Sequence, residues 1–270
     1  MDEKKKYFTF GILGGFGIIA IIIGILIFLP IISMIAGPTT IAVVPIYGEI
    51  GYGASNENRT ITHPDAFASM MDDAINDPNV GAIVLDINSP GGSPVAAREM
   101  LEKVNSSHKP VIARISDVGS SAAYMVASGA DEIVASPSSL VGSIGVIMTL
   151  ADLSEYYKNE GMDIFSITGG KYKDMGADYR SLTPEEKDML QKIVDEEYEN
   201  FIKIVVNNRN LSVDYVKSIA EGKPYTGQQG LNVKLVDHLG GKEFAIELAG
   251  NKSHMLSYNT YEYGSWGLFG

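Results

Sequence analysis

The sequence predicts an α/β protein in which a mostly parallel sheet is flanked by helices, with a transmembrane helix at the N-terminus. Three observations predict this fold class. Short, almost continuously apolar runs alternate with segments whose apolar residues recur at helical spacing. Glycine-rich and serine-rich turns join the two kinds of segment. Before them, residues 8–36 contain no charged side chain, and about 20 such residues cross a bilayer core of roughly 30 Å.

The apolar N-terminal stretch is interpreted as an uncleaved membrane anchor. Lysines at positions 4–6 precede it, so the positive-inside rule places the N-terminus in the cytoplasm and the rest of the chain on the other side. A cleaved signal peptide would have a shorter apolar region and a small residue three positions before the cut, where cleavage after Ala36 would place Met34. We therefore expect a single-pass cell-membrane protein with an extracytoplasmic main domain.

The elements after the anchor follow from apolar patterning. Residues 41–50 form a continuous apolar strand, and a polar loop to residue 61 separates it from a helix at 63–77. Further strands are predicted at 80–87, 111–115, 132–135 and 163–168, and further helices at 94–104, from 121, at 153–161 and from 184 to about 206, with shorter segments at 213–220 and 228–232. The long helix has a capping box, because Glu186 lies three residues after the cap Thr183, with Pro184 between them.

Composition excludes several functions. The net charge is −12 with no basic stripe, so nucleic acid is not an expected partner. Cysteine is absent, which excludes thiol catalysis, cysteine-ligated metals and disulfides. We expect no metal and no cofactor. The domain boundaries that follow are 1–37 for the N-terminus and anchor, 38–250 for the main domain, and 251–270 for a tail rich in tyrosine and glycine.

Two small-residue turns are candidates for catalytic chemistry. Residues 117–124 read D-V-G-S-S-A-A-Y after an apolar strand, which indicates a sharp turn into a helix with Ser121 at its start. Residues 88–92, N-S-P-G-G, follow another strand, and glycines there let backbone N–H groups approach an oxyanion. Each turn alone has an ordinary structural explanation, as a helix cap or a strand-to-helix turn. Together they resemble the parts of an acyl-transfer site.

A serine nucleophile needs a base. None of the four histidines lies in a suggestive context, so nothing supports a Ser-His-Asp triad; they are His63, His108, His238 and His254. The other base available is a lysine whose pKa burial lowers. Lys171 and Lys173, in the segment G-G-K-Y-K-D at 169–174, are the candidates, although an isolated lysine is usually a solvated surface charge.

Four motifs in order carry a resemblance to a known family. They are N-S-P-G-G at 88–92, G-S-S-A-A-Y at 119–124, V-G-S-I-G-V-I at 141–147 and G-G-K-Y-K-D at 169–174, and the match spans roughly residues 41–247. The sequence resembles the short form of signal peptide peptidase A (SppA), a family of membrane-anchored serine proteases with a ClpP/crotonase-like fold. The resemblance implies Ser121 as nucleophile and Lys173 as general base.

The resemblance also implies the supporting residues. Ser143 matches a serine that orients the base lysine, and Gly91 or Gly92 with the N–H of Ala122 matches the oxyanion hole. Alanines at 122 and 123 replace the two glycines that usually follow the nucleophile, and the adjacent Ser120 leaves a one-residue ambiguity that the alignment to Tyr124 resolves.

The family's activity implies an endopeptidase for remnant signal peptides and other hydrophobic or unfolded polypeptides, acting at the membrane as a homo-oligomer. In some members serine and lysine come from neighbouring subunits. Two alternatives stay open from the sequence: a non-proteolytic member of the crotonase-like fold, and a catalytically inactive scaffold protein at the membrane.

Overall fold

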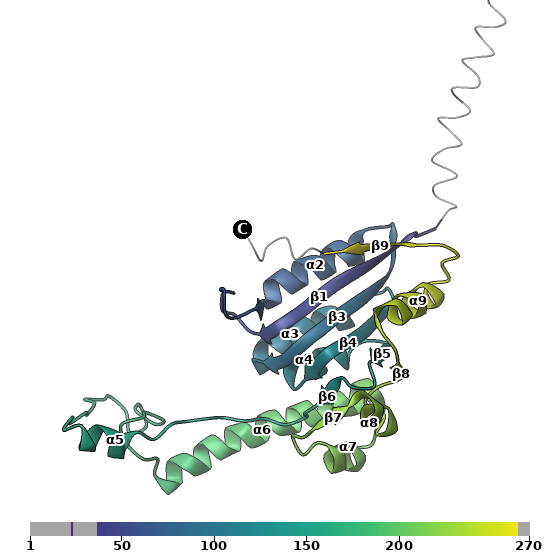
Figure 1. Ribbon diagram of the computed structural model, residues 1–270. Coiled ribbons are helices and arrows are strands. Elements are labelled where there is room, and N and C mark those ends of the chain that lie inside the picture. Colours follow the sequence, from purple (N-terminus) through teal and green to yellow (C-terminus); the bar gives the residue numbers. More distant parts are fainter. Residues whose placement is uncertain (1–22, 24–36, 264–270) are drawn as a thin grey trace, which may run out of the picture.

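The computed structural model describes Ile23 and residues 37–263. Its strands form one sheet in the order β2–β1–β3–β4–β5–β8, with β6 pairing β4 and β7, and β9 pairing β1 (Figure 1). The strands are β1 (Thr40–Ile50), β2 (Ile61–Thr62), β3 (Val80–Gly92), β4 (Val111–Ser120), β5 (Glu132–Ala135), β6 (Leu140–Gly142), β7 (Pro224–Thr226), β8 (His238–Leu239) and β9 (Asn259–Glu262). Every pairing between them is parallel except that of β6 with β7.

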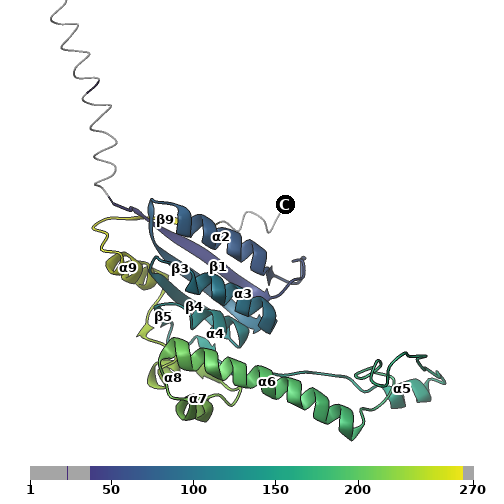
Figure 2. The same ribbon diagram turned by 180° about the vertical axis from the view of Figure 1, so that it is seen from behind.

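Helices cover both faces of the sheet, as predicted. On one face α2 (Pro64–Asn76), α3 (Pro94–Asn105) and α4 (Ala122–Ala127) pack over the main apolar core. On the other face α9 (Lys242–Lys252) contributes Ala245 and Ala249 to a smaller apolar cluster with β1, β3 and β4 (Figures 1 and 2). The central strands are mostly apolar because both of their faces are buried, and the buried Asp86 of β3 is paired with Arg114 of β4 at 2.7 Å. The mostly parallel, helix-flanked fold class is confirmed.

The remaining helices are α5 (Ser154–Asn159), α6 (Pro184–Arg209), α7 (Val213–Ile219) and α8 (Gly227–Asn232). The predicted capping box of α6 is present: Thr183 accepts the Glu186 N–H at 3.2 Å and Glu186 accepts the Thr183 N–H at 2.9 Å. Two reciprocal bonds satisfy donors that a helix start otherwise leaves unpaired. They fix the beginning of α6 at Pro184.

After β6 the chain leaves the globular part and returns only along α6. We call residues 146–153 the arm and residues 154–181 the tip lobe. In both ribbon views the tip lobe, which contains α5, lies near the end of α6 that is farthest from the sheet (Figures 1 and 2). The strand predicted at 163–168 is wrong: the segment has no regular secondary structure. A strand needs a pairing partner, and in the described part of the chain none lies beside it.

The ends of the molecule differ from the sequence-based description. Residues 259–262 of the tail, which had no clear pattern, form β9 beside β1, and the Asn259 N–H donates to Thr39 O at 2.8 Å. The predicted membrane anchor lies outside the described residues. Within residues 37–263, no helix combines the length and the apolar character needed to span a bilayer.

Candidate active site

Three of the four motifs converge on the end of β4. This strand lies between β3 and β6, with Gly119 opposite Ser89 on one side and Val141 on the other. Ser120 lies opposite Gly142. Because the three strands are parallel, their carboxyl ends meet at one edge of the sheet. The site is therefore assembled from turns that are far apart in the sequence.

Ser121 stands at the junction of β4 and α4 in an unusual backbone conformation. Its φ is 53° and its ψ is −126°, and its N–H donates to Gly142 O at 2.7 Å. Such a conformation costs of order 1–3 kcal/mol for a residue with a Cβ, and strain of this kind occurs mainly at functional sites. The half-buried Ser121 lines two cavities. The neighbouring Ser120 is buried and donates its hydroxyl to Leu140 O at 3.4 Å, so the geometry favours Ser121 as the exposed serine.

Gly91 packs directly against the serine turn. A Cβ on Gly91 would lie 2.8 Å from Ser121 Cβ and 2.9 Å from Ala122 N, and its φ is +106°. Its own N–H donates to Ser89 Oγ at 3.2 Å. Gly92, rather than Gly91, lines a cavity together with Ser121 and Ala122. The structure thus brings both glycines to the predicted oxyanion hole, with Gly91 allowing the close approach and Gly92 facing the cavity.

The N–H of Ala122 completes the donor side of this site. Ala122 is the first residue of α4, and the first N–H groups of a helix have no partner within the helix. Tyr124 holds the turn in place, because its fully buried hydroxyl donates to Leu235 O at 2.8 Å. Burial raises the pKa of Tyr124, so the phenol stays neutral. The alanine methyl groups at 122 and 123 point into the core and leave the N–H groups in place.

Ser143 lies across the cleft from the N-terminus of α4. It follows Gly142, whose carbonyl binds Ser121, and it has a φ of 50°. Its hydroxyl donates to Gly222 O at 2.9 Å. Ser121 and Ser143 line one open cleft of about 560 Å³. The predicted lysine-orienting serine is therefore beside the predicted nucleophile.

A second, smaller cavity of about 100 Å³ adjoins this cleft at Ser121. Met125, Val146, Ile147 and Phe201 make its lining largely apolar. Glu197 also lines it, and its carboxylate is held by Arg98 at 2.7 Å. The sequence motifs did not indicate the residues from α6. No motif marks them, and only the packing of α6 against α4 brings them to the site.

Lys173 does not reach Ser121 within one chain. It lies on the tip lobe, whose neighbouring residues Lys171 and Tyr172 both bind Glu185 in the first turn of α6. The residue of α6 beside the Ser121 cavity is Glu197. At 1.5 Å per residue, Glu185 and Glu197 are about 18 Å apart along the helix. A lysine side chain cannot cover that distance, so a single copy holds the predicted nucleophile and the predicted base apart.

The two candidate lysines differ in their surroundings. Lys171 Nζ donates to Glu185 at 2.8 Å and to the Tyr172 hydroxyl at 2.7 Å. The hydrogen bond to Glu185 raises the pKa of Lys171, which keeps it protonated and unsuited to act as a base. Lys173 is exposed and has no carboxylate within ion-pair distance among residues 37–263. Of the two, the geometry leaves Lys173 available.

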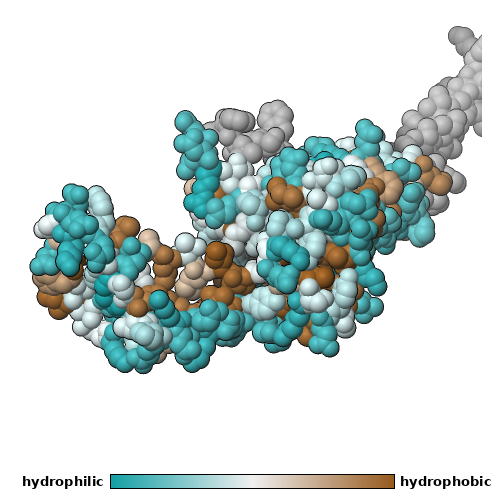
Figure 3. Space-filling view, turned by 60° about the horizontal axis from the view of Figure 1, so that its bottom comes forward, coloured by the Kyte–Doolittle hydropathy of each residue, from teal (hydrophilic) through white to brown (hydrophobic). Residues whose placement is uncertain are grey.

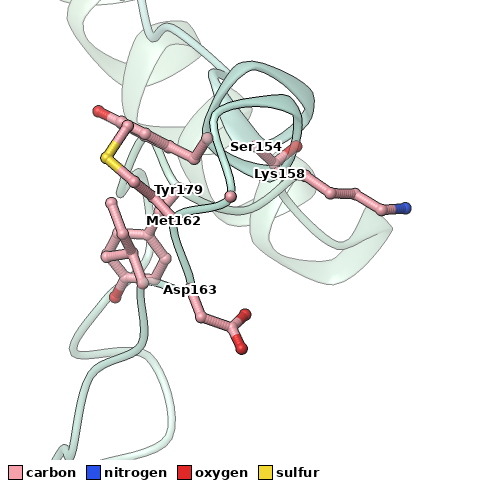
Figure 4. A pocket seen from close by; sticks show the side chains of 8 residues that line it. Ser154, Lys158, Met162, Asp163 and Tyr179 are labelled. Carbon is pink, nitrogen blue, oxygen red and sulfur yellow. The ribbon is translucent and has the colours of Figure 1, made fainter.

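The tip lobe has a cavity of its own, of about 420 Å³ (Figure 4). Ser154 and Lys158 of α5 lie on one side, with Met162, Asp163 and Tyr179 on the other. Tyr179, one of the lining residues, has its hydroxyl oxygen within hydrogen-bond distance of Ser166 Oγ, at 2.6 Å. None of the residues that line this cavity lines either Ser121 cavity, so it belongs to the internal packing of the lobe.

Comparison with known proteins decides the family. Residues 103–255, more than half of the chain, match the family described as Peptidase family S49. The chain belongs to peptidase family S49. It is 40% identical over 212 residues to a Methanocaldococcus jannaschii protein provisionally named as a protease, covering 76% of this chain and 67% of that one.

Other S49 relatives carry more specific names. The chain is 33% identical to "Protease 4" of Salmonella typhi over 81% of its length, and 34% identical to the chloroplastic serine protease SPPA of Arabidopsis thaliana over 64%. It spans 36% and 26% of those two proteins. Among solved structures, a membrane-bound stomatin-specific protease in a serine mutant form gives a TM-score of 0.52 at 14% identity, covering 84% of this chain and 98% of that one, which shows a shared fold. The chain is an SppA-like S49 protease.

Proposed function

We propose that this S49 protease is a membrane-anchored serine endopeptidase in which Ser121 of one copy and Lys173 of a neighbouring copy form the catalytic dyad. The observation that carries the proposal is that, within one chain, the Lys173 segment is bound near Glu185 whereas Ser121 lies near Glu197, two points about 18 Å apart along α6. A general base must lie within hydrogen-bond reach of the proton that it takes. A second copy, docked so that its tip lobe meets this cleft, satisfies that requirement.

The surface of the arm and tip lobe supports association with a second copy. Apolar side chains gather along the arm between the tip lobe and the rest of the chain (Figure 3). Ile147, Phe165 and Ile167 are 86%, 77% and 95% exposed. Exposed apolar surface of this extent is typical of an interaction surface. Covering it with another copy would also take the ammonium group of Lys173 out of water, which favours the neutral amine that a base must be.

The proposed reaction uses only groups of this site and water. Lys173 Nζ takes the proton of the Ser121 hydroxyl, and the serine oxygen attacks the carbonyl carbon of a peptide bond. The N–H groups of Ala122 and Gly92 hold the resulting oxyanion. Lys173 returns the proton to the leaving amine, and water then hydrolyses the acyl-enzyme. Ser143, across the cleft, accepts a hydrogen bond from the incoming lysine and orients it.

The substrate class follows from where the site is held. We propose that residues 8–36 anchor the chain in the cell membrane with the N-terminus in the cytoplasm, so that the catalytic domain lies outside the bilayer. A site in that position meets hydrophobic segments that leave the membrane, among them remnant signal peptides. The largely apolar cavity beside Ser121 suits an apolar side chain next to the scissile bond.

Complementation between inactive copies tests the proposal. Full-length Ser121→Ala and Lys173→Ala chains, carrying different tags, are co-expressed, and oligomers containing both are isolated in detergent by tandem purification. Hydrolysis of a synthetic signal peptide is then measured. We expect each variant alone to be inactive and the mixed oligomer to regain activity, because some sites combine an intact Ser121 with an intact Lys173.

Lys171→Ala is the matched control, since it removes the neighbouring lysine of the same segment, and it should retain most of the activity. An inactive mixed oligomer, beside an active parent, would refute sharing of the dyad. Retained activity in folded Lys173→Ala alone would refute the dyad itself.

A further inference from the structure

Arg180 lies in the tip lobe between two carboxylates. Its Nε and Nη2 donate to Asp174 at 2.9 and 2.8 Å, and its Nη1 and Nη2 donate to Glu186 at 2.9 and 2.7 Å. Nη1 also donates to Ser181 O at 3.2 Å. A guanidinium bound in this way on two edges has both its position and its plane fixed. Arg180 therefore joins Asp174 rigidly to Glu186.

Each carboxylate belongs to a different part of the chain. Glu186 is in the first turn of α6, its side chain is 4% exposed, and it also accepts the Thr183 N–H of the capping box. Asp174 directly follows Lys173 and also accepts the Tyr179 hydroxyl at 3.2 Å. A continuous series of bonds thus runs from the start of α6 to the residue after the proposed base.

The Lys173 segment has little rigidity of its own. Gly169 and Gly170 precede it and Gly176 follows, with φ of +110° at Gly170 and +87° at Gly176. Glycine leaves a backbone free to adopt many conformations. Within the segment, the Lys173 N–H donates to Gly170 O at 3.3 Å, a long turn bond. The bonds of Arg180 to Asp174, after Lys173, and those of Lys171 and Tyr172 to Glu185, before it, therefore together restrain the direction in which Lys173 projects.

Asp174 and Glu186 are both charged at neutral pH. The hydrogen bonds from Arg180 lower the pKa of Asp174 and that of Glu186 to about 2. The bonds between Arg180 and the two carboxylates therefore persist at neutral and alkaline pH. In that range a lysine base is neutral more often. The other charged groups that line the same surface hollow as Arg180 and its two carboxylates are Lys171 and Glu185.

We propose that Arg180 is a positioning residue for the base: it fixes the Lys173 segment to the start of α6, so that the copy that supplies Lys173 presents it in one orientation to Ser121 of another copy. The inference rests on the proposed function, because it takes Lys173 as the base. α6 then acts as a spacer of set length, with its first turn holding the lysine segment and Glu197 beside the Ser121 cavity of its own copy. A displacement of about 1 Å at a reacting group costs up to about 100-fold in rate.

Mixed oligomers separate this role from a general structural one. In oligomers of Ser121→Ala and Lys173→Ala copies, each working site takes its lysine from the first kind of copy and its serine from the second. Arg180→Ala is added to one kind of copy or to the other, in full-length chains purified as before. On the lysine-supplying copy, we expect the maximal rate of peptide hydrolysis to fall about 10- to 100-fold with little change in KM. On the serine-supplying copy, the rate should equal that of the parental mixture.

Two further variants complete the test. Arg180→Lys on the lysine-supplying copy should give an intermediate rate, because an ammonium group cannot bind both carboxylates in the bidentate manner of a guanidinium. Lys192→Ala is the control on the same helix; this residue pairs with Asp188 at the surface and should change the rate on neither copy.

The outcomes distinguish failure of the proposed Arg180 role from failure of the proposed shared dyad. Equal loss from either copy would show that Arg180 only maintains the fold, and no loss from the lysine-supplying copy would show that the segment is held without it; each overturns the inference and leaves the shared dyad standing. An inactive parental mixture beside an active wild-type oligomer overturns the shared dyad and this inference with it.

Discussion

The backbone strain at Ser121 makes a prediction about stability that is independent of the chemistry. With φ 53° and ψ −126°, the residue holds a conformation that glycine adopts freely and that costs a residue with a Cβ of order 1–3 kcal/mol. Ser121→Ala removes the hydroxyl and keeps the Cβ, whereas Ser121→Gly removes both. Glycine loses about 0.5–1 kcal/mol through the greater freedom of the unfolded chain. The glycine variant should therefore be more stable than the alanine variant by about 1 kcal/mol.

Thermal unfolding of the two variants, at equal concentration in the same detergent, measures this difference. For a domain of this size 1 kcal/mol corresponds to about 2–4 °C in Tm. Both variants should lack peptidase activity, so the gain in stability would come at the position of the proposed nucleophile. Ala123→Gly, two residues further along in α4, is the matched control and should lose about 1 kcal/mol, as glycine does in a helix. A Ser121→Gly variant that is less stable than Ser121→Ala, as in the control, would refute the strain.

Two further predictions concern the oxyanion turn and the tip lobe. Gly91→Ala should abolish peptide hydrolysis while the chain stays folded, because the added methyl would lie 2.8 Å from Ser121 Cβ and must displace the turn; an active, folded variant would contradict the tight packing there. The pKa values of Asp174 and Glu186, lowered to about 2 by Arg180, predict a stabilisation that is fully present above about pH 6 and lost progressively as the pH falls from about 5 toward 2. The Tm difference between wild type and Arg180→Ala should accordingly be constant from pH 7 to about 6 and shrink below about pH 5, and a difference that already shrinks near neutral pH would contradict the assignment.

The parts of the site that the sequence indicated are those that lie at strand ends. Ser121 and the two glycines at 91 and 92 come after predicted apolar strands, and parallel strands bring such turns to one edge of a sheet, whereas Ser143 was indicated only by the family resemblance. Their convergence in the structure agrees with that interpretation. Glu197 was not foreseen, because it lies within a long helix and no local signal marks which of its residues will face the site. Packing of α6 against α4 alone selects it.

The strand predicted at 163–168 was wrong for a related reason. Its apolar residues suit a buried strand, but strand formation depends on pairing with another segment, and a window of sequence contains no information about the pairing partner. The structure leaves Phe165 and Ile167 exposed on the tip lobe. The opposite error concerns residues 259–262, whose polar, tyrosine-rich sequence gave no strand pattern and which nevertheless pair with β1.

Apolar periodicity and capping side chains were enough to predict the fold class, the order of the main strands and helices, and the start of α6, because these signals act over a few neighbouring residues. The sequence also indicated a serine at a strand-to-helix turn. Which residues meet could not be predicted in this way: the register of β3, β4 and β6 places Gly91 against Ser121, and the length of α6 separates Lys173 from it. Those relations depend on contacts between segments far apart in the chain, where spacing along the sequence does not fix distance in space.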